Sequence, residues 1–91
     1  MSFLKRLFGG GAAAAPAFGT VEHEGFTIQP EPMPEGGQYR LAAVISKEIN
    51  GEVRTHRLIR ADLFTDADQA AEFAVTKAKQ VIGEQGDHLF R

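Results

Sequence analysis

A strand pattern that turns back on itself is the feature that most constrains the fold of this chain. Residues 38–48 alternate between two sets of side chains, as a half-buried strand does, and one set is Tyr39, Leu41, Ala43 and Ile45. Asn50-Gly51 marks a tight turn, and residues 52–62 return as a second strand. These residues predict a β-hairpin.

Two registers of this hairpin differ in the side chains that share a face. A two-residue loop at Asn50-Gly51 pairs Leu41 with Arg60 and mixes apolar and charged residues on each face. A three-residue loop, with Gly51 as the left-handed bulge residue, pairs Leu41 with Ile59 and sorts the residues. We therefore expect the three-residue loop. Its apolar face contains Tyr39, Leu41, Ala43, Ile45, Val53, Ile59 and Ala61. Its outer face contains Arg40, Arg54, His56, Arg60, Glu48 and Glu52. Lys47 and Arg57 lie near the edge of the apolar face.

The segment before the hairpin predicts one more strand and a loop. Residues 21–29 alternate loosely, and Gly25 indicates a bulge or tight turn within this strand. Residues 30–37 contain three prolines and two glycines, which remove backbone donors and loosen the chain, so we expect a loop. Three strands then follow one another as an antiparallel meander.

A helix is expected from Thr65 to about Gly83. Asp66 and Asp68 suit its N-terminus, where the helix dipole is positive. Either Gly83 or Gly86 ends it, and the apolar residues that follow either pack on the core or fray. One broad stripe of this helix is apolar and rich in alanine, and it contains Ala67, Ala70, Ala71, Ala74, Val75, Ala78, Val81 and Ile82.

The expected fold class is therefore α+β, a three-stranded antiparallel meander with one amphipathic C-terminal helix on one face. Residues 18–91 form a single small domain. The chain of 91 residues has no cysteine, which excludes a disulfide scaffold and a cysteine-ligated zinc site. No apolar run approaches the roughly 20 residues of a membrane span. A core this small often gains stability from a partner surface.

Residues 1–17 predict a short amphipathic head on a flexible Gly/Ala linker. A helical wheel puts Phe3, Leu4, Leu7 and Phe8 on one side and two cations on the other. Three interpretations remain open: a frayed tail, a piece that docks on a partner, a membrane surface or its own domain, and a secretory signal. The head has no acidic residue, so the other eight Lys/Arg and all twelve Asp/Glu give residues 18–91 a formal charge of −4. This charge opposes broad nucleic-acid binding.

Residues that carry chemistry are sparse. No glycine-rich stretch has the flanks of a phosphate-binding loop, and His23, His56 and His88 lack metal-ligand spacing. No serine has the partners of a catalytic triad. We therefore expect no enzyme activity, no cofactor and no metal. The double-stranded-RNA-binding fold has a related element order, but Asp66 and Asp68 stand where that module is basic, so we expect no RNA partner.

One group of side chains on the expected outer face is a candidate contact surface: Arg40, Arg54, His56, Leu58 and Arg60. The group is open to two interpretations. It forms either an ordinary solvated face with cross-strand ion pairs, or a surface for a protein partner, a homodimer or a limited phosphate contact.

Several stretches resemble the small bacterial HlyU family, and they are residues 3–9, 25–32, 35–42, 47–52, 56–62 and 85–90. The resemblance implies a transcriptional activator with direct or indirect DNA contact. A helix-turn-helix reader needs successive helices with a basic recognition helix, and this sequence predicts one long helix. Our main hypothesis is a non-enzymatic, cytoplasmic interaction module with a protein partner or a homodimer. The alternative is a transcriptional regulator, and peripheral membrane contact through the head is the less favoured use.

Overall fold

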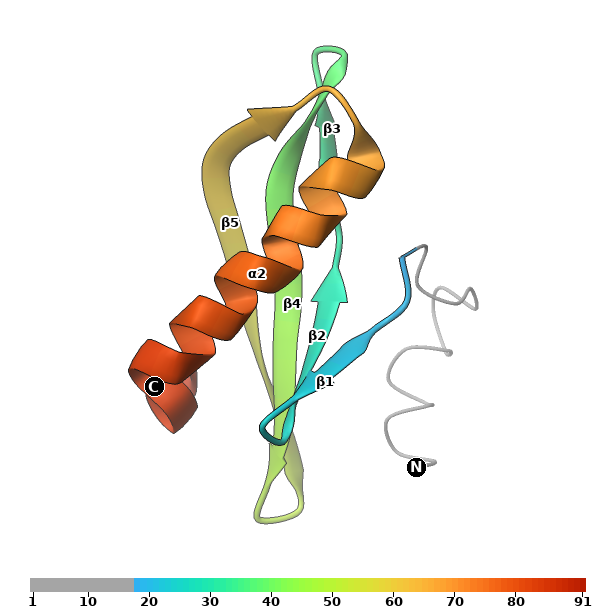
Figure 1. The fold of residues 1–91 in the computed structure, drawn as a ribbon. Coiled ribbons are helices and arrows are strands. Elements are labelled where there is room, and N and C mark those ends of the chain that lie inside the picture. Colours follow the sequence, from blue (N-terminus) through green and yellow to red (C-terminus); the bar gives the residue numbers. More distant parts are fainter. Residues whose placement is uncertain (1–17) are drawn as a thin grey trace.

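The computed structural model describes residues 18–91, which form an antiparallel sheet with one helix across it (Figure 1). The expected α+β class with a C-terminal helix is confirmed. The predicted head, with Phe3, Leu4, Leu7 and Phe8, and its linker lie outside the described residues. The elements are β1 (Val21–His23), β2 (Phe26–Pro30), β3 (Met33–Glu35), β4 (Gln38–Ile49), β5 (Glu52–Phe64), α2 (Ala67–Gln85) and the 3-10 helix η1 (Gly86–Phe90).

Strand β4 is the centre of the sheet. Strand β5 pairs along one side of it, while β2 and β3 pair one after the other along its second side, and β1 pairs with β2. The predicted loop thus contains a short strand, β3, and Pro34 is tolerated there because β3 lies at an edge. Between β2 and β3, the Glu31 amide donates to the Ala42 carbonyl at 2.9 Å, which keeps this bent segment against β4.

Each of the three hairpins closes with a two-residue turn in which both central residues have positive φ. This is the type I′ geometry, whose backbone twist matches the right-handed twist of the flanking strands. The turn predicted at Gly25 is confirmed as one of these turns. The central pairs are Glu24-Gly25, with φ of 52° and 85°, Gly36-Gly37, with 57° and 82°, and Asn50-Gly51, with 53° and 81°.

The expected three-residue register of the β4–β5 hairpin is wrong. Ile49 pairs with Glu52, and Ile45 pairs with His56, as a two-residue loop requires. The reason lies in the turn, because Asn50 tolerates the left-handed conformation that type I′ demands at its first central position. Each β5 side chain between Glu52 and Ile59 therefore lies on the face opposite to the one we expected.

A bulge then interrupts the β4–β5 pairing. Ala42 pairs with Ile59, but Arg40 pairs with Leu63, so β5 has two additional residues opposite this part of β4. Beyond the bulge Phe64 pairs with Tyr39 and lies on the helix side of the sheet, where its ring stacks on Phe73 of α2 with 5.1 Å between centroids. Because the bulge adds two residues, Ile59 and Leu63 still share one face of β5, while the residue pattern alone did not indicate the change of register.

The core lies between α2 and one side of the sheet, which we call the inner face. The predicted alanine-rich stripe is confirmed, with Ala70, Ala71, Ala74, Ala78, Val81 and Ile82 buried. Small side chains allow the helix to lie close to the sheet. The sheet contributes Phe26, Ile28, Leu41, Ala43, Ile45 and Leu58 to the same core, and Leu89 of η1 completes it.

Both ends of α2 are fixed by local contacts. Asp66 is the N-cap, and its Oδ1 accepts from the Asp68 amide at 3.1 Å. Gly86, with a φ of 55°, ends the helix and donates its amide to the Ile82 carbonyl. The apolar residues after the helix pack rather than fray, since Phe90 stacks on Phe26 with 6.0 Å between ring centroids.

Lys47 lies on the inner face, at the end of the core nearest η1. Its Nζ is 2.9 Å from Asp87 Oδ1 and 4.6 Å from the centre of the Phe26 ring. The ion pair and the cation–π contact together explain how a lysine is accommodated beside the apolar core.

Candidate interaction surface

The sheet surface opposite α2 is the outer face, and no element within residues 18–91 covers it. Strand pairing and side-chain alternation assign its members. They are Glu22, Thr27, Gln29, Glu31, Met33, Glu35, Gln38, Arg40, Ala42, Val44, Ser46, Glu48, Val53, Thr55, Arg57, Ile59 and Leu63.

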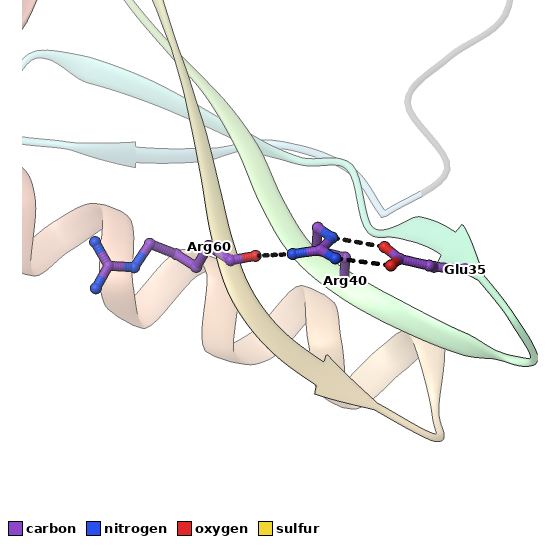
Figure 2. A network of polar contacts seen from close by, with 3 residues as sticks. All are labelled: Glu35, Arg40 and Arg60. Atoms are coloured by element: carbon purple, nitrogen blue, oxygen red, sulfur yellow. Dashed lines mark hydrogen bonds and ion pairs between the residues drawn. The ribbon is translucent and has the colours of Figure 1, made fainter.

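The five predicted contact residues do not share this face. Arg40 lies on it, but Arg54 and His56 belong to the inner face because of the corrected register. Leu58 is a core residue with 6% of its surface exposed. Arg60 lies in the bulge, and its side chain extends away from Arg40 (Figure 2). The predicted arginine cluster is therefore not assembled.

Arg40 instead connects three strands. Its Nε and Nη2 donate to the two carboxylate oxygens of Glu35 on β3, at 2.6 and 2.7 Å. Its Nη1 donates to the Arg60 carbonyl on β5 at 3.2 Å, so all three guanidinium nitrogens are engaged (Figure 2). The bidentate geometry is the strong form of an arginine–carboxylate pair. Arg40 thus stabilises the sheet at the bulge, and its guanidinium is not free for a ligand.

This contact changes the acid–base properties of both groups. The hydrogen bond from Arg40 lowers the pKa of Glu35, with partial desolvation opposing it and the charge of Arg40 adding to it. The same hydrogen bond raises the pKa of Arg40. The pair therefore stays ionised at neutral pH and contributes no net charge to the outer face.

A second polar cluster on the outer face is centred on Glu31. Gln29 Nε2 donates to Glu31 Oε2 at 2.7 Å, and Arg57 Nη2 lies 3.7 Å from Glu31 Oε1. At the neighbouring edge, Thr27 Oγ1 donates to Glu22 Oε2 at 3.0 Å. Both outer-face arginines are thus paired with glutamates, and the face as a whole is not basic.

Two exposed apolar side chains lie on the outer face of β5. Ile59 has 47% and Leu63 40% of its surface exposed. Half-buried Met33, Val44 and Val53 belong to the same face. The expected three-residue register put Ile59 on the apolar face of the hairpin, so this patch was not predicted. The two-residue register at Asn50-Gly51 was the signal that would have found it.

Other kinds of site find little support in the part of the chain that the structure describes. Within residues 18–91, no three His, Asp or Glu side chains gather as metal ligands would. No helix in this range combines the length and apolar character that crossing a membrane requires.

Comparison with known proteins gives a match to a family model. The model of the family described as "Transcriptional activator HlyU" matches residues 2–90. Neither the curated proteins nor the solved structures contain a match to the chain.

Proposed function

The chain belongs to the HlyU family, and on this premise we propose that it regulates transcription as a non-enzymatic module that acts through protein contact. The observation that carries the proposal is the exposed apolar pair Ile59 and Leu63 on a sheet face that no described element covers. Apolar patches with polar surroundings mark interaction sites in proteins. The outer face is the proposed contact surface.

The charges of the outer face favour a protein partner over the DNA backbone. Phosphate binding relies on lysines and arginines that are free to neutralise the nucleic acid. Here Arg40 and Arg57 are held by Glu35 and Glu31, and phosphate would have to replace those carboxylates. Charge pairs at the rim of an apolar patch instead suit the polar border of a protein interface.

The helix also gives poor support for direct DNA reading. A recognition helix enters the major groove with basic and amide side chains toward the bases. The exposed side of α2 carries Asp68, Glu72 and Glu84, with Lys79 as an exposed cation among them. We therefore propose that any effect on promoters passes through a protein partner.

The test compares how well the wild-type protein and its variants complement a strain that lacks the gene. Transcript profiling identifies the genes whose expression depends on the protein. Wild type should restore their expression, and a double variant, Ile59→Asp with Leu63→Asp, should not, because two carboxylates would be buried unpaired in the interface. Thr76→Asp, on the exposed side of α2, is the matched control and should restore expression. Circular dichroism verifies that each variant is folded.

Two outcomes contradict the proposal. Full complementation by the double variant would show that the apolar patch is not the contact surface. Binding of the purified protein to the affected promoters, with affinity that falls steeply as salt rises, would indicate direct DNA contact instead.

A further inference from the structure

A groove lies beside α2, on the inner-face side of the molecule. The helix crosses the sheet diagonally, and β1 and β2 lie to one side of the helix (Figure 1). A hollow of about 210 Å³ is lined by Phe18, Val21 and Pro30 from the sheet side and by Ala71 and Val75 from the helix. This volume lies below the roughly 300–1,000 Å³ of small-molecule sites, so the groove suits side chains better than a cofactor.

The rim of this groove is acidic. Asp68 and Glu72 line it and are exposed, one helical turn apart on α2. None of the ion pairs between residues 18–91 involves either carboxylate. An occupant with apolar side chains and positive charge could therefore pack against the apolar lining of the groove and pair with the carboxylates at its rim.

The chain itself contains a segment of this chemistry. Residues 3–8 read Phe-Leu-Lys-Arg-Leu-Phe, with four large apolar side chains and two cations, and residues 1–17 contain no acid. Amphipathic segments of this kind bind by placing apolar anchors in a groove. The opposite charges of Lys5 and Arg6 and of the groove rim favour the same contact.

The chain between residues 3–8 and the groove is long enough for the two to meet. Phe18, where the described chain begins, lines the groove. Residues 9–17 lie between it and the apolar segment, and they span up to about 30 Å when extended, at about 3.3 Å per residue. A short covalent connection also gives an effective concentration in about the millimolar range, so a weak contact suffices.

We propose that residues 3–8 dock in this groove of their own chain, with Phe3, Leu4, Leu7 and Phe8 as anchors and the cations beside Asp68 and Glu72. The groove is then an internal binding site for the basic amphipathic head. It lies on the opposite side of the sheet from the outer face, so it is independent of the function proposed above.

The experiment uses the full chain, whose lack of cysteine allows a single spin label at Ser2→Cys. We expect the label to broaden the amide signals of Ala71 and Val75 in wild type. Lys5→Glu with Arg6→Glu should reduce this broadening, since each exposed ion pair changes such an equilibrium by about 1.4- to 5-fold. Adding Asp68→Lys and Glu72→Lys should restore it.

Controls separate docking from proximity of the tether. Lys79→Glu, which reverses a cation elsewhere on α2, should leave the broadening unchanged. Leu4→Ser with Leu7→Ser should reduce it as the head charge reversal does. Equal broadening in wild type and in both head variants would overturn the proposal. Broadening that appears only between a labelled and an unlabelled copy would overturn it too, since the occupant would then be the head of a second chain.

Discussion

Replacing Leu58 by alanine should destabilise the protein far more than replacing its neighbour Ile59. Leu58 is 6% exposed and pairs with Ala43 in the core beneath α2, whereas Ile59 is 47% exposed on the outer face. Truncation of a buried leucine costs about 2–5 kcal/mol, which includes the cavity that remains. Truncation of the half-exposed isoleucine should cost about 1 kcal/mol, mostly through lost strand propensity and partial burial.

The difference is large against the total stability. A domain of this size has about 5–10 kcal/mol of unfolding free energy. Leu58→Ala, at about 2–5 kcal/mol, should remove roughly a fifth or more of it. Each kcal/mol lowers Tm by about 4–8 °C. Leu58→Met conserves the volume and should cost less than about 1.5 kcal/mol.

Urea unfolding followed by circular dichroism measures these effects, provided that the m-values of all variants agree with wild type. A larger loss for Ile59→Ala than for Leu58→Ala would refute the reasoning. It would mean that Ile59 faces the helix, as a three-residue loop at Asn50-Gly51 requires.

Substitutions at four further positions test local features of the fold. Arg40 lowers the pKa of Glu35 below its ordinary 4.5, so this pair stabilises the fold above that pH. The stabilisation is lost as the pH falls through the lower pKa of the folded state. Glu35→Gln should therefore lose less stability than wild type on acidification, measured by urea unfolding across the acid range. Gly51→Ala forces a side chain into a φ of 81° and should cost about 1–2 kcal/mol, while Gly83→Ala, inside α2, should stabilise by up to about 1 kcal/mol in the same thermal unfolding series. Asp66→Ala should cost about 1 kcal/mol by removing the helix cap, and Asp66→Asn should restore most of it.

The helix and the central strands were predictable because their patterns agree with their burial. The alanine-rich stripe of α2 is buried against the inner face of the sheet along the length of the helix. Its apolar residues therefore recur with the helical period of 3.6 residues, which identified the helix. The residue pattern likewise located β4 and β5 and the turn between them. The short strand β3 was missed because prolines argue against central strands and not against edge strands.

The register failed for a physical reason. We assumed that one face of β5 is wholly apolar, but β5 is an edge strand, and its outer face exposes Ile59 while its inner face carries Arg54 and His56. The preference of Asn50-Gly51 for a two-residue turn outweighs the separation of apolar and charged side chains onto different faces, and it sets the register. Since a slip of one residue moves a strand's side chains to the other face, most of the candidate contact surface moved with it.

The three tight turns have a consequence for the order in which the sheet assembles. The hairpins they close join strands that are adjacent in sequence, so little chain entropy opposes each closure. Local pairing of this kind correlates with fast folding, whereas all-β sandwiches with distant pairings fold in milliseconds to seconds. The strands on both sides of β4 can form before the helix docks. Since α2 packs on the inner face and not within the sheet, its docking can follow the pairing of the strands.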